Sequence, residues 1–148
     1  MIRNATLEDL TDIAVTGWEM HQESRFSKFP YDVEKVIELA SRLIESERGI
    51  CLLYEKDGVL IGGFMGEVVE HYFGRSLAAY DYALFILPQF RGGTAAMRLI
   101  KEFVKQAVEK GAQEVVIANS TGVDSEMVEK LYKKLKFTRV GGVYVYEG

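Results

Sequence analysis

The chain has 148 residues, of which 48% are hydrophobic and 27% charged, and at this length and composition we expect one globular domain covering residues 1–148. The formal net charge of -4 and the lack of a lysine- or arginine-rich block argue against nucleic-acid binding. No apolar stretch approaches the roughly 20 residues that a membrane-spanning helix needs, so we expect no membrane partner.

The beginning of the chain predicts a strand followed by two helices. Residues 1–5 form a short strand, and Thr6 with Asp9 three positions later forms a relative of the capping box at the start of a helix. A polar and aromatic loop then interrupts the helical pattern. Apolar residues recur at helical spacing from Asp32 to near Gly49, which predicts a second helix.

A hairpin and a long apolar strand follow these helices. Two apolar runs within residues 50–70 are joined through Lys-Asp-Gly at 56–58, a strong turn signal. Residues 77–87 are almost continuously apolar, as expected of a central strand.

The second half of the chain alternates helices and strands. An amphipathic helix ends at Gly111, and a strand over 114–120 and a helix over 124–135 come next. Residues 137–147 are expected to close the chain as one or two strands. This order predicts a mixed α/β (α+β) fold with antiparallel hairpins early and strand–helix–strand crossovers late.

The single cysteine, Cys51, excludes an internal disulfide and is typical of a reducing compartment. It lies in an apolar run, so we expect a buried residue without a catalytic role. The first residues, "MIRNATLEDL", carry charges where a secretory signal needs apolar side chains. We therefore expect a cytoplasmic protein.

The stretch "LPQFRGGTAAMRLIKEF" places glycines between a buried strand and a helix. The first N–H groups of a helix lack partners inside it, and with the positive end of the helix dipole they bind anions. Gly92 and Gly93 permit close approach of a phosphate, and Arg91 can add a charged hydrogen bond. The alternative is a plain tight turn with Arg91 in solvent. No GxxxxGK[ST] is present, which argues against a P-loop nucleotide enzyme. The "GGFMG" glycines lie within the hairpin and do not open a helix, so they do not form a dinucleotide-binding fingerprint.

Three segments resemble those of the GNAT-type N-acetyltransferases. "FILPQFRGGTAAMRLIKEFVKQAVEKG" is similar to the acetyl-CoA-binding segment, "EKLYKKLKF" to a later family segment, and "IRNATLEDLTDIA" to the usual first strand and helix. The resemblance implies a mixed, mostly antiparallel central sheet flanked by about four helices, with a splayed strand pair forming the cofactor cleft. It also implies an enzyme that uses acetyl-CoA as co-substrate, without a metal, and transfers the acetyl group by direct attack of a primary amine in a ternary complex.

The resemblance implies a set of cofactor contacts. Arg91 and Ala96 take the first and last positions of the family's Arg/Gln-x-x-Gly-x-Gly/Ala pattern, but Thr94 replaces the usual glycine. Since a β-branched residue tolerates positive φ poorly, either the turn is already helical at Thr94 or the phosphate sits differently. Ser125 replaces a common asparagine and either bonds the pantetheine or caps the helix. The expected cofactor-binding residues are Leu84, Phe85, Ile86, Arg91, Gly92, Gly93, Thr94, Ala95, Ala96 and Ser125.

Tyr132 matches the family tyrosine that protonates the departing thiolate of coenzyme A. A phenol supplies a proton without charging the site at neutral pH. The alternative is plain packing, because Tyr132 falls on the apolar face of its helix. Lys136 stands where the family usually has glycine before Phe137, so the motif does not determine what stops that helix.

The residue that removes a proton from the amine is less clearly marked. Asp81 is the first candidate, because a carboxylate in an apolar strand must face a cleft or a partner. Glu67 is the second, and Glu70, His21 and His71 follow. A chain of water molecules is the alternative to any dedicated base.

The loop "HQESRFSKFPYD" is expected to cover the acceptor site, with Arg25, Phe26, Phe29 and Tyr31 as candidate lining residues. The acceptor is a small-molecule or peptide amine, and the sequence does not choose between them. Two rival functions are a coenzyme A-binding sensor or scaffold without catalysis and a domain binding another phosphate ligand. A homodimer through "VGGVYVYE" is a further expectation, because an apolar strand edge there would otherwise be exposed.

Overall fold

Four of the five strands are consecutive antiparallel neighbours in one sheet, in the order β1-β2-β3-β4-β5. The structure is a computed structural model that describes residues 1–148. β5 joins the edge of β4 in parallel, after the crossover through a helix that such a connection requires. The strands are β1 (Ile2–Asn4), β2 (Gly49–Lys56), β3 (Val59–Glu70), β4 (Leu77–Ile86) and β5 (Glu114–Val116).

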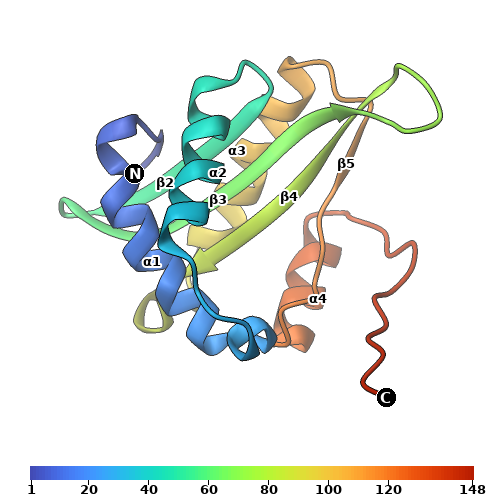
Figure 1. Cartoon of the computed structure of the whole chain (residues 1–148). Helices are drawn as coiled ribbons and strands as arrows, with labels where there is room; N and C mark the ends of the chain where they lie inside the picture. Colours follow the sequence, from blue (N-terminus) through green and yellow to red (C-terminus); the bar gives the residue numbers. More distant parts are fainter.

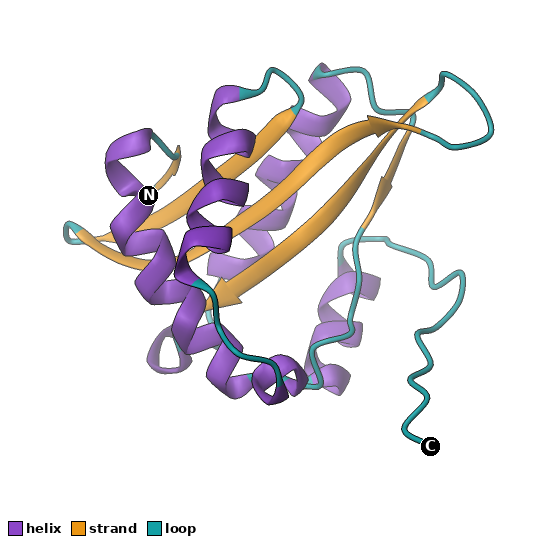
Figure 2. Ribbon diagram, viewed as in Figure 1, coloured by secondary structure: helices purple, strands orange, loops and turns teal.

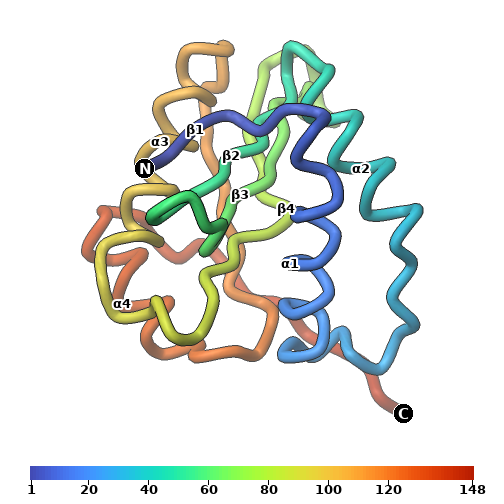
Figure 3. The backbone as a smooth tube through the Cα atoms, turned by 90° about the vertical axis from the view of Figure 1, so that its left-hand side faces the viewer, coloured from blue at the N-terminus to red at the C-terminus, as the bar shows by residue number.

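Two helices cover each face of this sheet (Figures 1 and 2). In the edge-on view of Figure 3, α1 and α2 lie on one side of the sheet and α3 and α4 on the other. The predicted mixed α/β fold with a mostly antiparallel sheet is confirmed. None of the helices is both long enough and apolar enough to cross a membrane. The helices are α1 (Leu10–Glu23), α2 (Val33–Glu45), α3 (Ala95–Glu109) and α4 (Ser125–Lys134).

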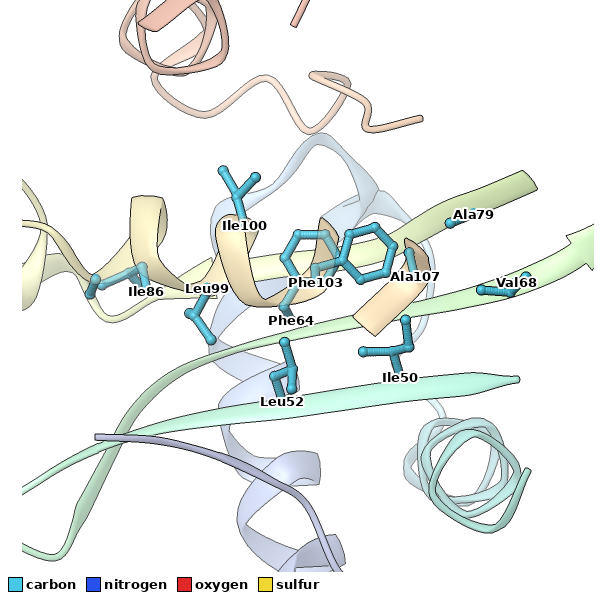
Figure 4. Packing of buried hydrophobic residues seen from close by; sticks show 11 residues of the cluster. Ile50, Leu52, Phe64, Val68, Ala79, Ile86, Leu99, Ile100, Phe103 and Ala107 are labelled. Carbon is cyan, nitrogen blue, oxygen red and sulfur yellow. The ribbon is translucent and has the colours of Figure 1, made fainter. Parts of the chain in front are cut away.

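The larger part of the core lies between the sheet and α3. Phe64 of β3 stacks on Phe103 of α3, as Figure 4 shows. Their ring centroids are 4.2 Å apart. Gly66 leaves the space for this contact, because a Cβ there would come within 2.3 Å of the Phe103 ring. This close approach fixes α3 on the sheet, and with it the turn that precedes the helix.

The predicted helix starts are found near the expected residues. The Asp9 carboxylate accepts a hydrogen bond of 2.7 Å from the Thr6 N–H, as in a capping box, although a short 3-10 turn precedes α1. The Asp32 carboxylate accepts from the Lys35 N–H and so caps α2. Arg3 forms ion pairs with Asp9 and Glu55, which ties the start of α1 to the sheet.

β4 and β5 are paired over only three residues. Ala78–Tyr80 are opposite Glu114–Val116, and no pairing continues beyond them. A register shift between Met65 and Gly66 of β3 leaves one extra residue in β4, between Asp81 and Ala83. Such a bulge bends a strand and increases its twist. The predicted strand over 114–120 is therefore shorter than expected, because the chain leaves the sheet after Val116.

The predicted strands over residues 137–147 are absent. The chain runs on without secondary structure after Phe137 and leads away from the sheet (Figure 1). Val140, Tyr144 and Tyr146 are more than 90% exposed, at 95%, 92% and 93%. A strand needs a partner edge, and the three residues of β5 offer too little of one, so an alternating pattern alone does not produce a strand.

α4 ends in a Schellman motif whose left-handed residue is a lysine. Lys136 has φ +69°, and its N–H donates to Lys133 O while the Phe137 N–H donates to Tyr132 O. The Phe137 ring packs against the Tyr132 ring, with centroids 6.0 Å apart. This apolar contact is the usual companion of the motif. Lys136 therefore stops the helix as glycine would, with a strained backbone.

We expect Lys136→Gly to stabilise the protein by about 0.5 to 1 kcal/mol, because glycine adopts positive φ without the steric cost that lysine bears. Urea unfolding measures the change. Lys134→Gly, within the last turn of α4, is the matched control and is expected to cost about 1 kcal/mol. A loss of stability in Lys136→Gly would contradict this account of the helix end.

Candidate functional site

A cavity of about 440 Å³ opens where β4 and β5 separate. It is lined by residues 81–86 of β4, the turn before α3, the loop after β5, the inner face of α4 and the end of α1. Most of the lining side chains are apolar, and the few polar groups come from different segments of the chain. Apolar walls with a few convergent polar groups are typical of small-molecule sites.

The glycine turn forms one end of this cavity. Gly92 has φ +90°, and a Cβ added at Gly92 or Gly93 would meet no atom within 4 Å, so the space beside the turn is open. Thr94 has φ -100° and is the N-cap of α3, so the positive φ falls on Gly92 and the threonine bears no strain. Of the two readings of Thr94, the structure agrees with a turn that has reached the helix start at this residue.

The backbone of this turn offers free donors. The Arg98 N–H donates to Thr94 O at 2.9 Å, which is the first bond of the α3 ladder. The N–H groups at the start of the helix, from Ala95 onward, therefore have no partner within it. They lie beside the cavity, at the positive end of the α3 dipole.

The Arg91 side chain does not extend into solvent. Its Nε donates to Ile86 O at 2.8 Å, and its Nη2 lies 2.7 Å from a Glu23 carboxylate oxygen. A second carboxylate, Asp124, lies 3.8 Å from Nη1, and the Phe85 ring lies below the guanidinium. The plain turn with a solvated arginine is therefore not what the structure contains.

Asp81 and Tyr132 meet at the backbone of one residue, Ala118. Both Asp81 carboxylate oxygens lie 3.2 Å from the Ala118 N–H, and the Tyr132 hydroxyl donates to Ala118 O at 2.7 Å. Burial raises the pKa of the Asp81 carboxyl, and the Ala118 hydrogen bond only partly opposes this. Burial also raises the pKa of the Tyr132 phenol, and the negative charge of Asp81 adds to the effect. Both groups line the cavity.

Glu67 lies outside the cavity lining and is already paired. It forms an ion pair with Arg42 of α2 and accepts a hydrogen bond of 2.7 Å from the Tyr82 hydroxyl. Burial alone would raise the pKa of Glu67, but the hydrogen bonds from Arg42 and Tyr82 outweigh it and lower the pKa. A carboxylate that is paired with an arginine and has a lowered pKa is a poor base.

Ser125 begins α4 but does not line the cavity. The N-cap residue is Asp124, and no side chain makes a capping hydrogen bond, so the expected cap by Ser125 is wrong. Its carbonyl accepts from the Asn119 side chain at 2.8 Å. The loop after β5, which contributes Ala118 and Asn119, was not singled out by the sequence because its residues match no motif.

The remaining candidates for the base lie away from the cavity. Glu70 and His71 are at the tip of the β3–β4 hairpin, where His71 stacks on Tyr72. His21 packs against Tyr31, and its Nε2 is buried without a hydrogen-bond partner.

Only Phe26 of the four loop candidates lines the cavity. Tyr31 donates its hydroxyl to Ala14 O at 2.8 Å, Phe29 is 55% exposed, and Arg25 bonds the loop after β5. Met20 and Glu23, in the last turns of α1, line the cavity instead. The sequence does not indicate that these two residues line the cavity, because its helical pattern covers all of α1 and only the C-terminal end of the helix reaches the cavity.

Cys51 is buried in β2, on the face covered by α1 and α2. Burial raises the pKa of its thiol to about 12, and the charge of Asp9 adds to this. The thiol is therefore not a nucleophile at neutral pH.

Residues 8–137, most of the chain, match the model of the acetyltransferase (GNAT) family. The chain belongs to this family and is an N-acetyltransferase. No curated protein sequence matches it significantly.

Several solved structures share the fold along the whole chain. An aminoglycoside acetyltransferase from an uncultured soil metagenomic sample is 18% identical with a TM-score of 0.76, over 100% of this chain and 97% of that one. A ribosomal-protein-alanine N-acetyltransferase from Brucella melitensis biovar Abortus 2308 is 21% identical with a TM-score of 0.73, over 100% and 98%. The aminoglycoside N-acetyltransferase AAC(6')-Iy, in complex with CoA, is 18% identical with a TM-score of 0.80, over 100% and 93%.

Proposed function

We propose that this protein is an acetyl-CoA-dependent enzyme that transfers the acetyl group to a primary amine by direct attack in a ternary complex. The observation that carries the proposal is the single cavity that collects the glycine turn, the unpaired edge of β4, Tyr132 and Asp81. We take residues 1–148 as one domain acting in the cytoplasm, without a metal.

Acetyl-CoA would lie along the opening between β4 and β5. Its diphosphate would accept hydrogen bonds from the N–H groups of residues 92–96, where the α3 dipole favours negative charge. The Arg91 N–H already donates to Pro88 O at 3.3 Å, so Arg91 would contribute through its side chain. The pantetheine arm of acetyl-CoA would pair with the backbone of Leu84–Ile86, which no strand occupies on that side, although Ile86 O already accepts from Arg91 Nε. Ser125 has no contact with the cofactor in this arrangement.

The reaction would need no covalent intermediate on the protein. The amine nitrogen attacks the thioester carbonyl carbon, and the C–S bond then breaks to release a thiolate. Tyr132 gives its proton to that thiolate. The raised pKa of the phenol keeps it protonated at neutral pH until the leaving group needs the proton, at which point it exchanges Ala118 O for sulfur as its acceptor.

Asp81 is the better of the two carboxylate candidates for the base. Its raised pKa makes the carboxylate a stronger base, whereas Arg42 and Tyr82 lower the pKa of Glu67. Asp81 also lines the cavity, and Glu67 does not. A water chain that ends at Asp81 would serve equally well when the amine lies beyond direct reach.

The acceptor would approach from the side of α1. Met20, Phe26 and Tyr82 form an apolar and aromatic wall there. The fold neighbours include enzymes named for aminoglycosides and for a ribosomal-protein alanine. Both a small-molecule amine and a peptide amine therefore stay within the proposal.

Two measurements test the proposal. Calorimetric titration with acetyl-CoA tests binding of the cofactor, and release of free thiol in the presence of a panel of amines tests catalysis. We expect micromolar binding and amine-dependent thiol release, because the donors of the turn are preorganised. ATP, which carries phosphates but no pantetheine, is the control ligand and is expected to bind far more weakly. Binding without turnover on any amine would overturn the catalytic assignment, and absence of binding would overturn the cofactor.

Tyr132→Phe is expected to lower the rate of acetyl transfer by about 100-fold or more, the usual contribution of a general acid, while acetyl-CoA affinity changes little. Tyr144→Phe, in the exposed tail, is the matched control and should leave the rate unchanged. Single-turnover kinetics with a saturating amine measure the effect. A Tyr132→Phe rate close to that of the wild type would show that the residue only packs.

Asp81→Asn separates catalysis from folding. The half-buried Asp81 carboxyl, with its raised pKa, binds its proton more tightly in the folded state, so it favours folding at acidic pH and loses this contribution as pH rises. The Asp81→Asn protein, whose asparagine is neutral at every pH, is therefore expected to unfold at the same or a higher temperature than the wild type at alkaline pH. Its kcat/KM should be low and lack the rise with pH that deprotonation of Asp81 gives.

Glu67→Gln is the comparison for this variant. Since it breaks the pair with Arg42, it is expected to lower stability while keeping the pH-dependent rise of kcat/KM. If instead Glu67→Gln lost the pH-dependent rise of kcat/KM and Asp81→Asn kept it, Glu67 would be the base.

A further inference from the structure

The residue expected to face the cofactor diphosphate is bound to carboxylates of the protein itself. The Arg91 guanidinium lies 2.7 Å from Glu23 and 3.8 Å from Asp124, while its Nε is held by Ile86 O. The Arg91 and Glu23 side chains are 27% and 30% exposed, so the pair is partly shielded from solvent. A carboxylate that bonds Nη2 of an arginine in this way occupies one of the donors that a phosphate would use and offsets the charge that attracts it.

Glu23 belongs to a connection between three separate segments. It is the last residue of α1, and the next residue, Ser24, is buried. Arg25 follows, and its backbone N–H donates to Thr121 O at 2.9 Å while its side chain donates to Ser120 O. The end of α1 is thus tied both to the turn before α3 and to the loop after β5, all three of which line the cavity.

We propose that Glu23 is a latch that competes with the cofactor diphosphate for Arg91. The inference rests on the proposed function, since the competing anion is the diphosphate of coenzyme A. In the free enzyme Glu23 neutralises Arg91. An arriving diphosphate meets a like charge at this point and takes over Arg91 only as the carboxylate withdraws.

Glu23 is close in sequence to Phe26, which lines the same cavity. Arg25, which lies between them, holds the end of α1 to Thr121 O and Ser120 O, so the Glu23 side chain can leave Arg91 through its own torsions without moving the helix. Glu23 is therefore a positioning residue that acts through Arg91.

The test measures the dissociation constant of CoA for the wild type, Glu23→Gln and Glu19→Gln. Glu19 lies one turn earlier on α1, is exposed, and loses the same charge when it is replaced, so it controls for the change in net charge. Glu23→Gln is expected to bind CoA roughly threefold to tenfold more tightly than the wild type, the range of a partly exposed ion pair. Glu19→Gln is expected to match the wild type.

Two further measurements separate a latch from a structural support. Pantetheine carries the thiol arm without phosphates, so its affinity should differ by less than about twofold between wild type and Glu23→Gln. Thermal unfolding without ligand should show Glu23→Gln to be no more stable than the wild type, because it loses an ion pair. Tighter CoA binding in a protein that is not stabilised is the signature of a competing group.

The outcomes are distinct for the two proposals. CoA binding that is equal or weaker in Glu23→Gln overturns the latch and leaves the cofactor assignment intact. CoA binding by Glu23→Gln but not by the wild type supports the latch most strongly. If neither protein binds CoA, both the cofactor assignment and the latch are wrong.

Discussion

The whole site depends on the early end of the pairing between β4 and β5. A parallel strand that continued beside β4 would satisfy its backbone edge and fill the space with side chains. Here the pairing ends at Tyr80 and Val116, and the bulge in β4 follows directly. The two strands diverge, and the edge of residues 81–86 is left for another extended chain. In the proposed complex, main-chain groups of this edge would supply most of the contacts to the pantetheine arm, so few side chains would be required there.

Electrostatics complete what the backbone geometry begins. The start of α3 concentrates unpaired N–H groups at one end of the cavity, and the half-buried carboxylate of Asp81 lies at the point where the strands separate. Burial of a carboxylate costs free energy that packing must offset, and the Phe64–Phe103 contact belongs to the core that does so. A charge kept in such a place at the expense of stability is typical of a functional site.

Much of the fold could be predicted from local sequence signals. The Thr6–Asp9 pair and the turn at 56–58 act on their immediate neighbours, so the sequence shows them directly. The strand expected near the C-terminus failed because alternation describes a strand's faces and says nothing of its partner edge. The extent of β5 likewise depends on where β4 bends, which no local pattern reveals.

The candidate site divides in the same way. Two short motifs carry Arg91, the two glycines and Tyr132, so the sequence predicts these residues, and all four line the cavity. Glu23, Met20 and Ala118 reach the cavity from segments far apart in the chain, and their chemistry depends on that meeting. Thr94 was difficult to judge from sequence because its strain depended on which residue of the turn has positive φ, and the structure assigns this to Gly92.

The end of α4 has a consequence for how the enzyme would fail on heating. Tyr132 accepts, through its carbonyl, the bond that closes the helix stop, and its ring is braced by Phe137 just before an unstructured tail. Fraying of this final turn would displace the phenol from the cavity while the sheet stayed intact. Inactivation would then precede global melting, with the loss of a single helical turn as the first damaging event.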